Sequence, residues 1–542
     1  MNEIVGNSIT GRAVRKIAAW WHSGVFYRGW HWLRRQNESS NTLRRWRGMA
    51  DWPLRVENSV YARVMAALRR LCQVLGDWLR QSVFYRVLTA IRRGWDSLAH
   101  RSRIVGWISR ISLHQWLLVA FGLYLPLEFV IRDQLHLAAL SSVWEELFIL
   151  VAVAMILWRR ALRQTTAIRR ETPLDCWLLL FAAVGYLLMV LVRPYPDVAA
   201  AGYRIVMEYL IWFFLIVRLV ENDGDFRVLW ITLLLLLAVL ALHGLYQYAV
   251  AVEIPATWTS QTEMDVRTRV FSLTGSPNIL GSLMVLLAPL AAGGVYYARK
   301  PLAKLAFFAL LACSLLTLLF TFSRGAWLGM IVAIVIFALF IDKRLIALMV
   351  GGMAAVLLLV PSITNRITYL FTSDFATASA VGGRAMRWAL GKTLLESNPW
   401  LGFGLGRYGG AVAMQNQILD KTETFAYYYL DNYYLKTTVE MGYIGMIFYA
   451  LLLIALIVCA LRCIQRSGGS LSALPGDPLT RGVGQPRILA VSLFAGMMGV
   501  LMHCLFKNIF EEPYMTAYFW GMAAMLMYLG FFRGRSSGGE TS

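Results

Sequence analysis

The stretch TFSRGAWLGM, residues 321–330, places Arg324 between two apolar runs of the chain. An arginine at the centre of a membrane-spanning helix costs about 2.5–3.5 kcal/mol on insertion scales. Arg324 therefore either marks the turn between two helices or stands there to bind an anion. A guanidinium is always charged, and its planar fork of donors matches the oxygens of a phosphate group.

Three further arginines could bind an anion in the same way. Arg384 and Arg387 lie in GGRAMRWALGK, which we expect to form a short amphipathic helix followed by a glycine-rich turn. Arg269 begins the stretch RVFSLTGSPNILG. For Arg387 or Arg269 alone, an ordinary solvated cation is the simpler explanation. Arg384, like Arg324, is flanked by a glycine-containing turn beside a helix end, where a charge at membrane level is often functional.

The stretch DNYYLKTTVEMGYIGMIFYALLL, residues 431–453, could supply a general base. Asp431 and Asn432 stand at the mouth of an apolar helix, where Asp431 could accept a proton or merely cap the helix. Glu440 lies further along, inside the first turns of the apolar run. A carboxylate there is either paired with a cation or functional.

A histidine offers a second candidate base. His503 is in line with Lys507 and Glu511 at helical spacing, near the end of another apolar run. Its imidazole could take the proton instead, although a histidine in such a place more often packs and hydrogen-bonds.

Helix starts and tight turns must position these groups. Ser276 is a plausible N-cap and Pro277 suits the first helical position, so we expect a helix to begin there and continue through Asn278. The N–H groups at such an end attract anions. Gly402 and Gly404 follow no strand of a βαβ unit, so they indicate close approach of backbone to a ligand or another helix rather than a nucleotide site.

The composition is that of a polytopic membrane protein. Of the 542 residues 58% are hydrophobic and only 15% are charged, and the mean hydropathy is +0.56. The six cysteines form no spaced pair in a long polar loop, so we expect neither a disulfide framework nor a zinc cluster.

Twelve apolar runs predict an all-α fold of about twelve transmembrane helices. The runs lie at residues 113–131, 143–158, 174–192, 203–220, 228–249, 278–297, 302–320, 325–341, 344–361, 433–463, 488–506 and 514–532. The even-numbered connections are all basic, and so is the tail at 533–542. The positive-inside bias therefore predicts that both termini are cytoplasmic and that the long connection at 362–432 is a large extracytoplasmic loop.

Residues 1–112 form a separate basic region with 20 Arg or Lys against 6 Asp or Glu. The pattern V-x-x-R-x-x-x-x-[LI]-R-R recurs from Val25, Val60 and Val83, which predicts amphipathic helices with arginines on one side. We expect these helices to lie on the anionic lipids of the cytoplasmic leaflet and not on nucleic acid, because no recognition motif accompanies the charge. Docking of a chain-length regulator onto this region stays open.

The ordered set of motifs resembles the O-antigen ligase and O-antigen polymerase superfamily of bacterial membrane glycosyltransferases. The matching pieces are the G-x-P-N helix start, S-R-G-x-W-L-G, R-x-x-x-W before N-P-x-x-G-x-G, and the final N-x-x-L…E-x-G-x-x-G. The resemblance covers about residues 265–455 within a transmembrane domain at 113–532.

The resemblance implies a transfer reaction at the outer face of the bacterial inner membrane. The donor would be an undecaprenyl-diphosphate-linked glycan, and a hydroxyl of a glycan or lipid acceptor would attack its anomeric carbon with inversion, without a metal or another cofactor. Arg324 and Arg384 would hold the diphosphate, with Arg387 and Arg269 as further candidates.

One departure from the family pattern bears on the choice between its two activities. Ligases of this family usually carry a histidine immediately before the asparagine of the last motif, where this chain has Asp431 before Asn432. A carboxylate can still accept a proton, and the departure favours a polymerase of exopolysaccharide, capsule or O-antigen repeats over a ligase. A transporter of lipid-linked sugars is the alternative from another class, but the charged residues gather at the outer helix ends rather than along a path through the bilayer.

Overall fold

A computed structural model describes most of the chain. The described residues are 60–102, 106, 109, 111–135, 143–162, 171–255, 268–359, 361–369, 372–373, 384–417, 430–467 and 485–533. Two compact units are present, Met1–Leu71 and Cys72–Ser542, and of the first only residues 60–71 are described. The first repeat at Val25, three parts of the loop at 362–432 (370–371, 374–383 and 418–429) and the tail from 534 to 542 lie outside the described residues.

The described residues form helices and no β-strand. The α-helices of the first half are α6 (Val60–Gln81), α7 (Val83–Arg101), α9 (Leu113–Gly122), α10 (Tyr124–Phe129), α12 (Trp144–Ala161), α13 (Asp175–Leu191), α14 (Pro196–Met207), α15 (Ile211–Leu219) and α16 (Asp223–Ala249). Those of the second half are α17 (Pro277–Tyr297), α18 (Pro301–Phe320), α19 (Arg324–Phe340), α20 (Arg344–Leu359), α21 (Pro361–Thr368), α23 (Arg384–Glu396), α24 (Ala411–Asn416), α25 (Tyr433–Ser467), α26 (Gln485–His503) and α27 (Pro513–Met527).

Several of these helices can cross a membrane. Within the described residues seven segments are long and apolar enough, namely Pro196–Leu219, Asp223–Ala249, Pro277–Tyr297, Pro301–Phe320, Tyr433–Ser467, Pro486–His503 and Pro513–Phe532. A bent pair, Leu113–Gly122 with Tyr124–Gln134, makes an eighth candidate. The prediction of an all-helical, multi-pass membrane protein is therefore confirmed.

The predicted number of twelve spans is not established by these lengths. Each of the twelve apolar runs falls on a helix of the structure. However, α13, α19 and α20 are shorter apolar helices, and α12 carries charged residues at both ends. Twelve spans thus stay a prediction.

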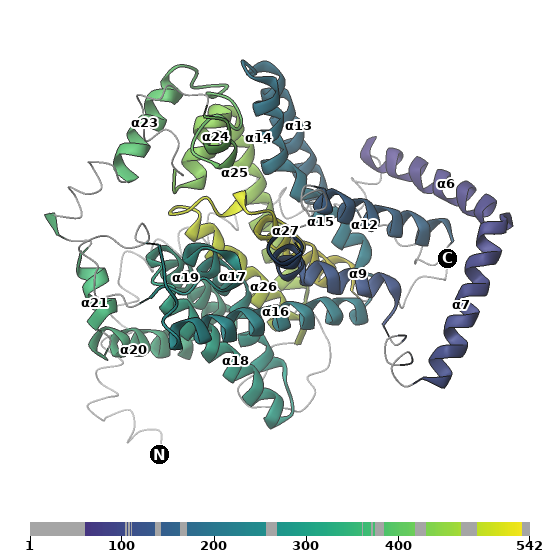
Figure 1. Cartoon of the computed structure of the whole chain (residues 1–542), viewed down its shortest axis with the longest axis horizontal. Helices are drawn as coiled ribbons and strands as arrows, with labels where there is room; N and C mark the ends of the chain where they lie inside the picture. The colour runs from purple at the N-terminus through teal and green to yellow at the C-terminus, as the bar shows by residue number, and fades with distance from the viewer. Residues whose placement is uncertain are drawn as a thin grey trace, which may run out of the picture. The chain divides into compact units, whose positions relative to one another are not determined.

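The helices α17, α19 and α26 pack closely and form the centre of the bundle that carries the motifs (Figure 1). Small residues permit this approach. A Cβ atom on Gly496 of α26 would lie 2.2 Å from the carbonyl oxygen of Leu286 in α17, and one on Gly329 of α19 would lie 2.6 Å from the carbonyl oxygen of Gly499. Close backbone packing of this kind is what holds helices together where lipid removes the hydrophobic driving force.

The long helix α25 is broken near its start. Gly442 has φ 66° and ψ −174°, outside the helical region. In an unbroken helix the N–H groups of Tyr443 and Ile444 would donate to the carbonyls of Val439 and Glu440. All four of these backbone groups must find other partners at the break.

The loop that follows α23 supplies those partners. The four replacing bonds are Phe403 N to Val439 O at 2.7 Å, Gly404 N to Glu440 O at 3.1 Å, Tyr443 N to Pro399 O at 2.8 Å and Ile444 N to Trp400 O at 3.2 Å. Gly402 allows the contact, because its φ is 85° and a Cβ there would lie 2.4 Å from the Gly442 nitrogen. The glycines at 402 and 404 thus bring backbone against a helix, one of the two meanings that their spacing suggests.

The second and third sequence repeats form α6 and α7. Along α7 the exposed apolar side chains recur every three or four residues, and they are Phe84, Val87, Ile91, Trp95 and Leu98. This is the stripe of an amphipathic helix.

Candidate active site

Four stretches that are distant in the sequence meet at one end of the bundle. The helices α17, α19 and α25 begin there and α26 ends there. His503, the last residue of α26, lies with its Nδ1 atom 2.9 Å from the hydroxyl of Ser282 in α17. A Cβ on Gly325, at the start of α19, would lie 2.7 Å from the His503 ring. The N–H of Tyr433 in α25 donates to the carbonyl of Cys504 at 2.9 Å.

Asp431 holds three cations at this end. Its Oδ2 atom lies 3.1 Å from Nη1 of Arg387 and 3.7 Å from Nε of Arg384, and its Oδ1 atom lies 3.2 Å from Nζ of Lys507. Asp431 itself has φ 56°, so the chain turns sharply just before α25. We call these four residues the cation cluster.

The cation cluster has more positive than negative charge. Burial by itself raises the pKa of Asp431, but the charges of Lys507, Arg384 and Arg387 outweigh burial and hold this pKa below its ordinary value near 3.8. Asp431 is therefore ionised at neutral pH, and one carboxylate faces three cations. Such a cluster attracts a further anion.

Two contacts fix α23 so that its first turn faces Asp431. The hydroxyl of Tyr408 donates to the carbonyl of Arg387 at 2.6 Å. The indole N–H of Trp388 donates to the carbonyl of Leu430 at 3.0 Å, next to Asp431 in the chain. The R-x-x-x-W pattern thus places on one short helix both a cation of the cluster and the tryptophan whose hydrogen bond fixes that helix.

Arg324 begins α19 and is half-buried. The turn before it is braced by Arg269, which is 7% exposed and donates from Nε to the carbonyl of Thr321 at 3.1 Å. Arg324 precedes Gly325, which packs on the His503 ring. The residue after His503, Cys504, accepts the N–H of Tyr433 at the start of α25, two residues after Asp431. The structure therefore brings Arg324 to the same end of the bundle as the cation cluster, whereas Arg269 acts on the backbone behind it.

The start of α17 lies beside His503. Pro277 occupies the first helical turn, and Ser276 stands at the N-cap position but makes no side-chain capping bond. The carbonyl of Asn278 accepts a bond from the Ser282 hydroxyl at 3.0 Å, and the same hydroxyl meets His503. This chain of contacts orients the imidazole, which is 1% exposed.

Asn432 caps α25, since its Oδ1 atom accepts the N–H of Leu435 at 3.0 Å. Asp431 therefore does not cap the helix, and its carboxylate contacts the cations of the cluster instead. The Asp-Asn pair therefore divides the two roles that the sequence allows for it.

Glu440 lies in a buried ion triad. Nζ of Lys436 lies 2.5 Å from Glu440 and 2.9 Å from Glu511. The remaining oxygens of the two carboxylates accept backbone N–H groups of Tyr408 at 3.3 Å and Ala411 at 3.0 Å. Of the two readings that the sequence allows for Glu440, this geometry matches pairing with a cation, and the triad fixes the glycine-rich loop to α25.

Lys507 is the member of the cation cluster for which the sequence predicts no role. It follows α26 and is separated from Asp431 by 76 positions. Its spacing from His503, one helical turn, is the signal that could have indicated it.

No set of three or more His, Cys, Asp or Glu side chains in the described residues gathers as metal ligands would. The expectation that the reaction needs no metal stays a prediction.

Residues 308–450 match the family model described as O-antigen ligase. The matched stretch begins in α18 and ends in α25, so it contains Arg324, Arg387 and Asp431. Lys507 and His503 lie beyond it. Among the curated proteins, none matches the chain.

Proposed function

The chain belongs to the O-antigen ligase and polymerase superfamily through residues 308–450, and from this premise we propose that it transfers glycan from an undecaprenyl-diphosphate-linked donor. We place the reaction at the extracytoplasmic face of the bacterial inner membrane, with both termini in the cytoplasm. The substrates would then be a lipid-linked oligosaccharide and a glycan or lipid acceptor.

The observation that carries this proposal is the cation cluster. Arg384, Arg387 and Lys507 lie around a single carboxylate at one end of a membrane bundle. Guanidinium groups bind phosphate oxygens through two parallel hydrogen bonds and stabilise negative charge as it develops. A diphosphate leaving group is an anion of this kind, and Arg324 at the same end can add a further cation.

In the reaction one bond forms and one bond breaks. The oxygen of an acceptor hydroxyl bonds to the anomeric carbon of the donor sugar, and the bond between that carbon and the diphosphate oxygen breaks. Undecaprenyl diphosphate leaves with the electron pair, and the cations stabilise it. The hydroxyl proton passes to a base on the protein.

We assign that base to Asp431, activated by the donor. With three cations around it Asp431 is a weak base, because they lower its pKa. When the diphosphate takes the same cations, the carboxylate loses their stabilisation and becomes more basic. His503 is the second candidate, but its Nδ1 atom already meets Ser282 and its ring is buried.

Within the family we favour a polymerase of polysaccharide repeats. The sequence supports this choice, since Asp431 stands where ligases usually have histidine. A ligase that moves a finished glycan to lipid A core or another acceptor is the alternative.

The test uses purified protein, an undecaprenyl-diphosphate oligosaccharide and EDTA. We expect wild type to release undecaprenyl diphosphate and to build a ladder of repeats without added acceptor. Arg387→Ala should lower turnover about 100-fold, as loss of one transition-state donor does elsewhere. Asp431→Asn should lose turnover but still bind undecaprenyl diphosphate. Lys392→Ala is the matched control, because this exposed cation lies on the same helix outside the cluster.

The outcomes separate the alternatives. Release only when a distinct acceptor is added would identify a ligase. No release under any condition, with lipid moved across liposomes instead, would replace the transferase by a transporter. Equal activity in Arg387→Ala and Lys392→Ala would remove the cation cluster from the mechanism.

A further inference from the structure

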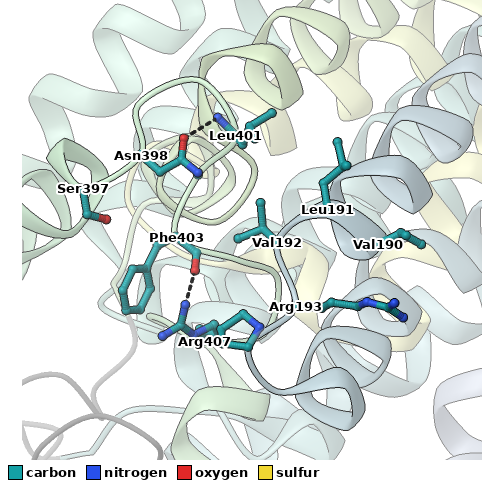
Figure 2. Close-up of a pocket in the computed structure, with 11 residues that line it drawn as sticks. Val190, Leu191, Val192, Arg193, Ser397, Asn398, Leu401, Phe403 and Arg407 are labelled. Carbon is teal, nitrogen blue, oxygen red and sulfur yellow. Dashed lines mark hydrogen bonds between the residues drawn. The ribbon is translucent and has the colours of Figure 1, made fainter.

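A hollow of about 520 Å³ lies between the end of α13 and the loop that follows α23 (Figure 2). The side formed by the end of α13 is mostly apolar, and the loop side carries both polar and apolar side chains. The lining residues on which the inference depends are Val190, Leu191 and Val192 on one side and Ser397, Asn398 and Arg407 on the other. No residue of the cation cluster lines it, so it is a separate place on the protein. We call it the α13 groove.

Arg407 is a cation without a counter-charge in the groove wall. Its Nη1 atom donates to the carbonyl of Phe403 at 2.6 Å, and its guanidinium lies 3.8 Å from the centre of the Phe403 ring. Its buried Nε atom has no hydrogen-bond partner in the described part of the chain. No carboxylate in the described part of the chain forms an ion pair with Arg407 either. Burial lowers the pKa of Arg407, as it does for a cation that lacks a nearby anion.

An anion in the groove would meet this need. A partly buried guanidinium that has no anion beside it costs free energy, and a charge-assisted bond from the part of Arg407 that lines the groove to a phosphate oxygen offsets that cost. Arg193 stands at the rim as a second, exposed cation. The head of the ligand should therefore carry a phosphate.

The apolar wall indicates that the rest of the ligand is lipid. It continues along α13 through Leu191 and Leu187, which are 57% and 55% exposed on an apolar helix. Trp400 and Tyr443, in contact and both exposed, flank the loop as aromatic residues do where membrane meets water. A phosphate on a hydrocarbon chain satisfies both walls at once.

The helix α23 relates the groove to the cation cluster. It begins with Arg384 and Arg387, which contact Asp431, and ends at Glu396, beside groove residue Ser397. Thirteen helical residues span about 20 Å. An oligosaccharide of a few sugars, anchored in the groove, can reach a donor held at the cluster.

We propose that the α13 groove binds the phosphate-bearing polyprenyl anchor of the acceptor, with Arg407 on the phosphate and α13 along the chain. This inference rests on the proposed function, in which the cation cluster holds the donor. It assigns two lipid-linked substrates to two places, which is the arrangement a polymerase needs.

The test measures how many undecaprenyl diphosphate molecules one protein binds in phosphatidylcholine nanodiscs. This probe carries no glycan and cannot react. We expect wild type and the control Lys392→Gln to bind two molecules, and Arg407→Gln to bind one. Ser397→Trp fills the groove from an exposed position and should give the same loss, so the result does not depend on how well Arg407→Gln folds. Arg387→Ala should lose the other molecule.

The two proposals fail in different ways. Loss in Arg407→Gln and Ser397→Trp with no change in Arg387→Ala would retain the groove and remove donor binding from the cluster. Two molecules bound in both groove variants would overturn the groove site. Loss of the Arg407-dependent molecule when phosphatidylglycerol replaces phosphatidylcholine would also overturn it, because the groove would then hold bulk anionic lipid.

Discussion

Asp431 organises three side chains that repel one another. Arg387 lies 44 positions away in the sequence and Lys507 lies 76 positions away. Without the carboxylate these cations would separate, and with a second anion in place they would stay. In the proposed mechanism, the Asp431 carboxylate thus occupies the position among the cations that the donor's phosphate takes.

The pH dependence of stability should report this role. The folded-state pKa of Asp431 lies below its ordinary value, so its ion pairs stabilise the protein above that value and are lost as pH falls through the folded pKa. We expect the melting temperature to carry this contribution at neutral pH and to lose it only below about pH 3.8.

Melting curves from neutral to acidic pH, on wild type and Asp431→Asn, measure the contribution. The gap in Tm between the two should close at the acidic end. Glu396→Gln, an exposed change on α23, is the control and should show no gap. A gap in Asp431→Asn that stays constant over the whole range would contradict the assignment.

Three of the four residues of the cation cluster could be singled out from the sequence as candidates, but their partners could not. Arg384, Arg387 and Asp431 stand out because charged residues beside apolar helices need a reason. Which cation meets which carboxylate depends on how distant helices end, and spacing along the chain contains no such information. Glu440 and Lys507 illustrate this, since one is bound in a buried triad and the other joins the cluster.

At the scale of elements, α25 and the loop after α23 form one unit. The broken turn at Gly442 exchanges its backbone hydrogen bonds with residues 399–404. The helices themselves follow from apolar runs and were predictable. The break was not, because the partners of its backbone groups lie about forty positions away.

Gly442→Ala should disrupt this unit. A Cβ there would lie 2.2 Å from the Trp400 carbonyl oxygen. A backbone with φ 66° and ψ −174° is in addition a conformation essentially restricted to glycine, which costs another residue about 1–3 kcal/mol. We expect a lower melting temperature together with loss of transferase activity, since the loop leads from α23 to Arg407.

Gly351→Ala is the matched control for that experiment. Gly351 lies in α20 with open space around its Cβ position, and alanine favours a helix over glycine by about 1 kcal/mol. Its melting temperature should stay the same or rise. Equal changes in melting temperature in the two variants would show that the break in α25 makes no particular contribution to stability.

At the scale of the whole molecule, the described helices make a multi-pass membrane protein whose motif-bearing ends gather on one side. Hydropathy predicted the apolar helices, and the motifs lie at the ends that the structure brings together. The side of the membrane that these ends face rests on the positive-inside bias.

Cysteine labelling in spheroplasts tests that orientation. Lys392→Cys, on α23, should react with a membrane-impermeant maleimide from outside. Lys300→Cys, exposed between α17 and α18, should react only after the membrane is opened. The wild-type protein measures the background from its own cysteines. The reverse pattern would move the proposed chemistry to the cytoplasm.

The exchange of backbone bonds between α25 and residues 399–404 also limits how relatives of this chain can vary. Backbone hydrogen bonds place no requirement on most side chains, so the amino acids of the loop can change. Its length is not, because adding or removing one residue would shift every donor away from its acceptor. Insertions among homologues should therefore fall outside 396–404, and exchanges at Gly402 and Gly442 should occur together or not at all.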